Sequence, residues 1–212
     1  MDNTEYFVKV KSFSHIPDEE LEAFSDHLMG VALNPSKALM DSIAFYFQSR
    51  RVEGIPIVPE KEHQTIKPFN FYPIQFSHIP DLNRFPFLDE VLHGIDIAQR
   101  AAFIFKNGRA LYPHTDRSYR RHVVNFPIKN ALTSKTCFFE IEDPSLEFRP
   151  SWCYPTGVKK VAELQYEPKT LSALCVQQIH SVEAVNDDPR IVLSATIDDN
   201  QNFADILRQL KK

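Results

Sequence analysis

The segment YPHTDRSYRRH, Tyr112–His122, places two histidines, an aspartate and three arginines between two apolar stretches. His114 and Asp116 are two residues apart, so in an extended chain both side chains project from the same face. An imidazole and a carboxylate at that spacing can occupy two adjacent coordination positions of a metal ion. The segment is therefore a candidate metal site that needs a third ligand from elsewhere in the chain.

The best-placed third ligand is His180, which ends the run LSALCVQQIH. Two histidines and one carboxylate on one face of an octahedron leave three positions open, an arrangement typical of non-haem Fe(II) oxygenases. A single H-x-D is weak evidence in a chain with eight histidines and 28 acidic residues. The hypothesis therefore depends on His114, Asp116 and His180 acting together.

A candidate anion-binding residue, Arg190, follows His180 by ten residues and begins the last expected strand. A guanidinium that points into a protein interior is costly unless a carboxylate pairs with it, ideally through two hydrogen bonds. A dicarboxylate co-substrate could supply that carboxylate with one end and bind the metal with the other.

The first half of the chain mixes helices with one strand. Glu5–Val10 is the expected strand, and the patterns of Pro17–Met29 and Pro35–Gln48 predict helices that begin with proline. Residues 52–80 are rich in proline and aromatics and predict an irregular segment. A short helix is expected at Phe87–Leu92.

From Ala101 onward the pattern predicts strands and turns. AAFIF and ALYPH indicate a hairpin around Asn107-Gly108. The further expected strands are Arg121–Ile128, Lys135–Ile141, Val158–Tyr166, Leu171–Val185 and Arg190–Ile197. Many short strands separated by turn residues favour a β-sandwich or barrel.

The last strand, Arg190–Ile197, indicates where helices and site should lie. Arg190, Ser194 and Thr196 share one side of it with Val192, and the intervening residues are all apolar. We therefore expect the polar side to face a site between the sheets, and helices to cover the outer face.

Composition excludes several other classes. The chain has 212 residues, 43% of them hydrophobic and 25% charged, which predicts one ordinary globular domain. A net charge of -4 argues against nucleic-acid binding. No apolar run could span a membrane, and the first residues, MDNTEYFVKVKSF, predict no secretory signal. Three cysteines without close pairing predict a reducing, cytoplasmic setting. Nothing in the sequence indicates the oligomeric state.

The order H-x-D, H and R, at His114, Asp116, His180 and Arg190, resembles the Fe(II)/2-oxoglutarate-dependent oxygenases with a double-stranded β-helix core. The likeness covers roughly residues 100–198. A closer resemblance is to the aspartyl/asparaginyl β-hydroxylase family, whose signature is a histidine in P-H-T followed by R-x-H. Here those motifs are Pro113-His114-Thr115 and Arg120-Arg121-His122.

This resemblance implies a fold that is mainly β (α+β), a double-stranded β-helix or jelly roll with N-terminal helices packed on the outer face of the major sheet. The whole chain, 1–212, would be a single domain. Residues 1–99 would form a flank and lid, 100–198 the core, and 199–212 a C-terminal helix. Segments 55–82 and 144–160 are the candidate lids.

The resemblance also implies a metal site and its co-substrates. His114, Asp116 and His180 would ligate Fe(II), and the reaction would consume O2. Arg190 would pair with the distal carboxylate of 2-oxoglutarate, with Ser194 as a weaker supporting contact.

Two further residues would contact 2-oxoglutarate near its metal-chelating end. These are Arg120 and His122, which we expect on one face of a strand. Val124 and Phe126, on the same face as His122, would line the core.

The implied activity is hydroxylation of an unactivated C–H bond in a small-molecule or peptide substrate, with an amino acid or peptidyl side chain favoured. Two alternatives remain open. One is a cupin-type metalloenzyme that does not use 2-oxoglutarate. The other is a non-enzymatic jelly-roll binding module, with segment 67–87 and the helix FADILRQLKK as partner surfaces.

Overall fold

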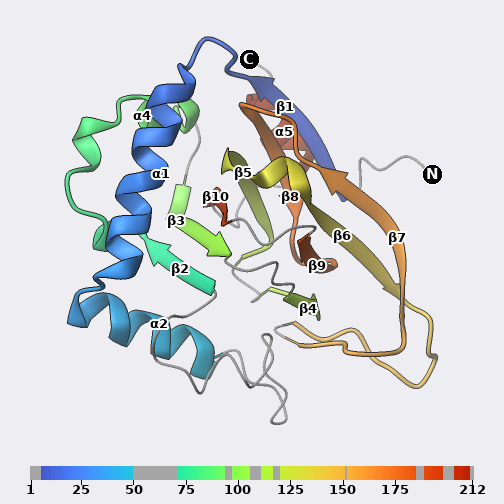
Figure 1. Cartoon of the computed structure of the whole chain (residues 1–212). Helices are drawn as coiled ribbons and strands as arrows, with labels where there is room; N and C mark the ends of the chain where they lie inside the picture. The colour runs from blue at the N-terminus through green and yellow to red at the C-terminus, as the bar shows by residue number, and fades with distance from the viewer. Residues whose placement is uncertain are drawn as a thin grey trace.

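The protein is built from two antiparallel β-sheets, with helices packed beside the larger sheet (Figure 1). The computed structural model describes residues 6–49, 71–93, 97–105, 111–116, 120–150, 152–184, 189–197 and 203–210. None of the described helices is long and apolar enough to cross a membrane.

In the described part of the N-terminal half there are three α-helices and two strands. Its elements are β1 Phe7–Ser12, α1 Asp18–Leu33, α2 Lys37–Ser49, β2 Phe71–Gln75 and α4 Phe87–Val91. Two 3-10 turns lie between β2 and α4, at Phe76–His78 and Leu82–Arg84.

In the described part of the second half, eight strands are followed by helix α5. They are β3 Ile97–Phe105, β4 Leu111–His114, β5 His122–Lys129, β6 Ser134–Ile141, β7 Val158–Gln165, β8 Thr170–Cys175, β9 Ile179–Ala184, β10 Arg190–Ile197 and α5 Phe203–Leu210. One 3-10 turn, Ala131–Thr133, precedes β6.

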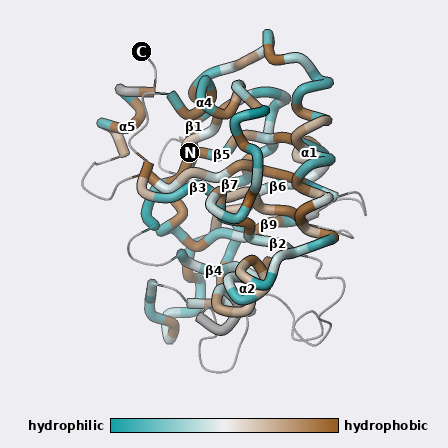
Figure 2. Tube along the Cα trace, turned by 90° about the vertical axis from the view of Figure 1, so that its left-hand side faces the viewer, coloured by the Kyte–Doolittle hydropathy of each residue, from teal (hydrophilic) through white to brown (hydrophobic). Residues whose placement is uncertain are grey.

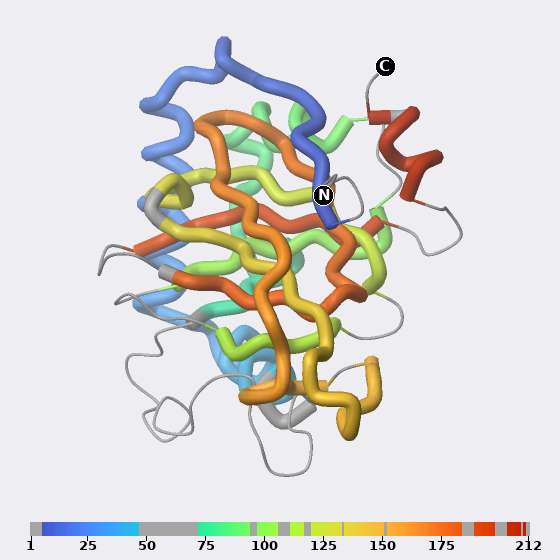
Figure 3. The backbone as a smooth tube through the Cα atoms, turned by 90° about the vertical axis from the view of Figure 1, so that its right-hand side faces the viewer, coloured from blue at the N-terminus to red at the C-terminus, as the bar shows by residue number. Residues whose placement is uncertain are grey.

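The strand order defines a jelly roll. The larger sheet runs β1-β8-β5-β10-β3-β2 and the smaller runs β4-β9-β6-β7. From β3 to β10 the chain crosses repeatedly between the two sheets (Figure 3), and these strands pair with their neighbours in antiparallel fashion. Eight strands connected in this way form the double-sheet architecture of jelly rolls and cupins. The expected mainly β, double-stranded β-helix fold is confirmed.

Helix α1 covers the outer face of the larger sheet. It begins after Pro17 and buries Leu21, Phe24, Leu28 and Ala32 at helical spacing. Hydrophilic and hydrophobic stretches consequently alternate along α1 in Figure 2. These side chains share one apolar core with the outward-facing residues of β10, which are Ile191, Leu193, Ala195 and Ile197. The inference drawn from the alternation in the last strand, that helices lie outside this sheet, is confirmed.

Two local expectations were wrong. The strands β3 and β4 do not form a hairpin, because β3 pairs with β2 and β10 in the larger sheet while β4 pairs with β9 in the smaller one. The expected turn at Asn107-Gly108 lies outside the described residues. The expected strand Leu171–Val185 is two strands, β8 and β9, in different sheets. Its apolar run contains no glycine or proline to mark the turn between them.

The segment 52–80 is only partly described. Residues 51–70 lie outside the described part of the chain, so the irregular structure expected there stays a prediction. Residues 71–75, which we also expected to be irregular, form the edge strand β2 beside β3. That part of the expectation was wrong, because pairing with β3 orders a proline-containing segment that has no alternating pattern. Proline is tolerated in such an edge strand.

The packing between α1, α4 and the larger sheet predicts a large loss of stability on truncation of Phe126. This ring is fully buried and meets Phe13 edge-on at 5.8 Å. We expect Phe126→Ala to lower the free energy of unfolding by about 3–5 kcal/mol, measured by urea denaturation. Phe148→Ala is the matched control, because Phe148 is 47% exposed. Its effect should stay within about 0.5 kcal/mol.

Candidate metal and anion site

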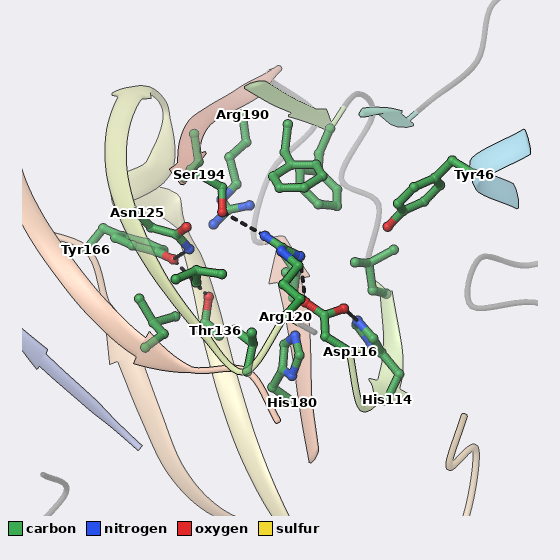
Figure 4. A pocket seen from close by; sticks show the side chains of 18 residues that line it. Tyr46, His114, Asp116, Arg120, Asn125, Thr136, Tyr166, His180, Arg190 and Ser194 are labelled. Atoms are coloured by element: carbon green, nitrogen blue, oxygen red, sulfur yellow. Dashed lines mark hydrogen bonds and ion pairs between the residues drawn. The ribbon is translucent and has the colours of Figure 1, made fainter. Parts of the chain in front are cut away.

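Three buried side chains converge between the two sheets. His114, Asp116 and His180 each offer one ligand atom, and these atoms lie within 4.8 Å of one another. His114 ends β4, and His180 stands directly opposite it in the neighbouring strand β9. Their ring centroids are 4.4 Å apart (Figure 4). The pairing of β4 with β9 therefore assembles the cluster that the spacing of the sequence predicted.

Both histidines have the tautomer that suits a metal ligand. Nδ1 of His114 donates to the carbonyl oxygen of Tyr112 at 2.7 Å, and Nδ1 of His180 donates to that of Gln178 at 2.9 Å. A carbonyl oxygen can only accept, so the proton is on Nδ1 and the lone pair is on Nε2. Metal-binding histidines are commonly oriented through such a bond from the other ring nitrogen.

The backbone between the first two ligands is fixed by Thr115. Its amide donates to the carbonyl of Trp152 at 3.0 Å, and its hydroxyl donates to the carbonyl of Arg149 at 2.7 Å and accepts from the Trp152 amide at 3.0 Å. Thr115 is completely buried. The segment around Trp152 therefore holds this stretch extended, which puts His114 and Asp116 on one side.

Within the candidate lid 144–160, the side chain of Tyr154 is buried, so Tyr154 is a packing residue.

Arg190 is a buried cation without a carboxylate partner among the described residues. Only 4% of its surface is exposed, and its guanidinium lies over the rings of Phe105 and Tyr166, 5.1 and 5.3 Å from their centroids. Its Nε has no hydrogen-bond partner. Burial lowers the pKa of Arg190, but a guanidinium remains charged at neutral pH. A buried charge in this condition is costly unless an anion binds to it.

Arg190 and the three candidate ligands line one pocket. The empty space between its side chains, including the part open to solvent, is about 510 Å³. Arg120, Ser194 and Asn125 add polar groups, whereas much of the remaining wall is aliphatic or aromatic. A metal ion and an organic anion could therefore occupy the same cavity.

Of the two other residues expected to contact the co-substrate, the structure brings only Arg120 into the pocket. It donates to Ser194 and Asp116 (Figure 4), and its Nε donates to Thr196. His122 instead lies on the outer side of β5, with its ring stacked 5.0 Å from that of Phe203 in α5. The expectation that both residues share a face was wrong.

The reason is that the strand alternation begins only at His122. Arg120 precedes β5, so its direction does not follow the two-residue period. Val123 and Asn125 are the residues of β5 that line the pocket. Val124 and Phe126 do share the outer face with His122 and belong to the core, as expected.

Several pocket residues were not identified from the sequence. Tyr46 of α2 lines the cavity, and nothing in the helical pattern distinguishes it. The Tyr166 hydroxyl accepts from the Asn125 side chain at 2.8 Å and lies 3.3 Å from the Thr136 hydroxyl. A lone asparagine within the apolar strand HVVNFPIK was a signal for an inward polar group.

Comparisons with known proteins give only distant likenesses. No family model and no curated protein matches the chain. Among solved structures, a viral collagen prolyl hydroxylase from Paramecium bursaria Chlorella virus-1, in complex with 2-oxoglutarate, is 14% identical over 92% of this chain and 97% of its own, with a TM-score of 0.43.

Two other solved structures illustrate the range. The non-haem α-ketoglutarate-dependent epimerase SnoN from nogalamycin biosynthesis is 10% identical over 91% of this chain and 76% of its own, with a TM-score of 0.49. A cupin domain from Bordetella pertussis is 14% identical over 47% and 79%, with a TM-score of 0.30. The neighbours thus include 2-oxoglutarate-dependent enzymes. Likenesses at this level carry no assignment of function, which rests on the side chains of the pocket.

The unbalanced charge of Arg190 predicts an unusual effect on stability. Arg190→Met keeps much of the side-chain volume and removes the buried charge. Without ligands, the free energy of unfolding of this variant should equal that of the parent protein or exceed it by about 1 kcal/mol. Urea denaturation measures the difference, with the exposed Arg208→Met as control. A loss of more than about 2 kcal/mol would show that Arg190 is well satisfied in the ligand-free protein.

Proposed function

We propose that the protein is an Fe(II)- and 2-oxoglutarate-dependent dioxygenase that hydroxylates an unactivated C–H bond. One observation carries the proposal. A cluster of two histidines and one carboxylate shares a pocket with a buried guanidinium that has no carboxylate partner among the described residues. The cluster suits Fe(II), and the guanidinium suits the distal carboxylate of a diacid.

The donor set fits a catalytic metal. Two Nε2 atoms and one carboxylate oxygen supply three ligands, and the remaining positions of an octahedron stay open for a co-substrate. The backbone bonds from Nδ1 keep both Nε2 atoms unprotonated, so binding needs no change of tautomer. Asp116, His114 and His180 are each buried, which limits competition from water.

The surroundings of Arg190 fit one end of 2-oxoglutarate. Phe105 and Tyr166 hold the guanidinium between their rings, and its Nε can donate to a carboxylate oxygen. A cupin-type enzyme that does not use 2-oxoglutarate would leave this charge without a counter-ion. The Nε of Arg190, which has no hydrogen-bond partner, therefore supports a reaction that uses 2-oxoglutarate over the cupin-type alternative.

Iron and 2-oxoglutarate, when bound, would supply the oxidising chemistry by which one oxygen atom of O2 enters a C–H bond and the other enters succinate, which forms from 2-oxoglutarate with release of CO2. The residues of the chain would do three things. His114, Asp116 and His180 hold the metal on one face, Arg190 orients the diacid, and apolar side chains such as Phe103 exclude water. Ser194 would add a hydroxyl beside the diacid.

For the substrate we propose an amino acid or a peptidyl side chain, as in the aspartyl/asparaginyl β-hydroxylases. The Pro113-His114-Thr115 motif supports this choice, because its histidine lies in the cluster. The R-x-H motif supports it only through Arg120, because His122 faces away. We also propose a cytoplasmic setting, because the three cysteines of the sequence form no closely spaced pair.

The reaction is tested first by spectroscopy without oxygen. Fe(II) and 2-oxoglutarate together should give the protein a visible metal-to-ligand charge-transfer band, because the diacid chelates the bound metal. His114→Ala should abolish the band. Arg190→Met should raise the Kd of 2-oxoglutarate at least about tenfold, the equivalent of losing about 1.4 kcal/mol. A folded protein that shows no band and no affinity for 2-oxoglutarate would refute the proposed function.

Turnover is tested by succinate formation in air. Amino acids and short peptides that contain Asp or Asn should stimulate succinate production above the rate without substrate, and mass spectrometry should find a product heavier by one oxygen atom. The His122→Ala variant is a useful control, because its ring lies on the outer face against Phe203. His122→Ala should therefore form succinate at the rate of the parent protein. A folded His122→Ala protein that formed no succinate would show that His122 has a role that its position outside the pocket does not explain.

A further inference from the structure

Arg120 pairs with Asp116 of the candidate metal site, and it also contacts side chains that an ordinary ion pair would not need. Its Nη1 donates to Oδ2 of Asp116 at 2.5 Å, its Nη2 donates to Ser194 at 2.8 Å, and its Nε donates to Thr196 at 3.2 Å. The guanidinium also lies over Phe103, 5.2 Å from the ring centroid. Every nitrogen of the guanidinium therefore has a fixed partner, and the group is held in one orientation.

These contacts make the two oxygens of Asp116 unequal. Oδ2 is occupied by Arg120, whereas Oδ1 lies 3.9 Å from Nε2 of His114. A separation near 4 Å leaves room for a shared metal ion between Oδ1 and Nε2. Charge-assisted bonds of the Arg120 type are short and strong, and here the acceptor is nearly inaccessible to solvent.

We propose that Arg120 is a positioning residue that restricts Asp116 to metal coordination through Oδ1 alone. The inference rests on the proposed function and adds a role that the sequence did not indicate. Carboxylates bind metals through either one or two oxygens, so the choice must be imposed by a neighbouring group. Arg120 imposes it by occupying the second oxygen.

The restriction matters because of the number of coordination positions. Two histidines and one oxygen of Asp116 use three of the six positions of an octahedron. A chelating diacid needs two more, and O2 needs the last. If Asp116 also bound through Oδ2, the diacid and O2 could not both be accommodated. Arg120 would thus keep the site open without touching the metal.

The anchors of Arg120 lie on β10, the strand that begins with Arg190. Ser194 lines the same pocket as Arg190 and accepts from Nη2, while Thr196 accepts from Nε. One strand therefore positions both the diacid-binding guanidinium and the guanidinium that restrains Asp116. A shift of β10 would change both ends of the site together.

The test uses Co(II) as a spectroscopic probe in place of iron, with Arg120→Gln and Arg120→Lys. In Arg120→Gln without 2-oxoglutarate, the visible d–d bands should move, because Oδ2 becomes available to the metal. Infrared spectra of protein labelled with ¹³C-aspartate should show a smaller splitting of the carboxylate stretches. Affinity for Co(II) should change less than about threefold, while the Kd of 2-oxoglutarate rises at least tenfold. Arg120→Lys should recover part of each effect, because an ammonium can still donate to Oδ2.

The spectrum without 2-oxoglutarate separates this role from a direct contact with the diacid. A residue that only binds the diacid would leave the Co(II) spectrum unchanged until 2-oxoglutarate is added, and that result would overturn the inference. Complete loss of Co(II) binding in a folded Arg120→Gln protein would overturn it as well. Arg208→Gln, which removes an exposed arginine, should change neither spectrum nor affinity.

Two milder variants guard against misfolding. Ser194→Ala and Thr196→Val release the anchors of Arg120 and leave its charge in place, so they should shift the same Co(II) bands by a smaller amount. An unchanged spectrum in both, together with an unfolded Arg120→Gln, would count against the inference. If the parent protein bound neither Co(II) nor 2-oxoglutarate, the proposed function would fail first. A parent that binds both, with an unaltered Arg120→Gln spectrum, would refute only the role of Arg120.

Discussion

The structure of the site depends on one constraint, which is the cost of keeping the Arg190 charge inside a jelly roll. The guanidinium is held by two aromatic rings, and no carboxylate among the described residues neutralises it. The apolar cores on both sides of the larger sheet must offset that cost. A buried charge of this kind lowers stability, and such a loss of stability is typical of functional residues.

The sheets themselves bring the remaining groups to this charge. Register between β4 and β9 puts His114 opposite His180, and the alternation of β10 turns Arg190 and Ser194 into the same pocket. Thr115 ties the segment with His114 and Asp116 to Trp152 and Arg149, so these candidate ligands are oriented in the absence of a metal. Preorganisation of this kind lowers the cost of binding, because few groups must be ordered at that moment.

How much could be read from the sequence varies with the range of the interaction. The alternation of β10 and the H-x-D spacing are local, and both correctly indicated an inward polar face and a shared side for two ligands. Two predictions were wrong, the hairpin of β3 with β4 and the single strand at 171–185. Both depend on where the chain crosses between the sheets of the jelly roll, and long-range pairing decides those crossings. The prediction that His122 shares a face with Arg120 was wrong because a period of two holds only inside a strand, and β5 begins at His122.

The N-terminal flank, residues 1–99, contributes to the pocket although it carries none of the motifs described above. Helix α2 of this flank contributes Tyr46 to the pocket that holds the candidate ligands. The strands of the core supply the groups that would hold a metal and a diacid, which are shared by any reaction of this class. Tyr46 lies outside that core and lines the pocket, but it is not among the residues proposed to hold the metal or the diacid. Variation in the flank can therefore alter what the pocket accepts while the groups on β4, β9 and β10 stay the same.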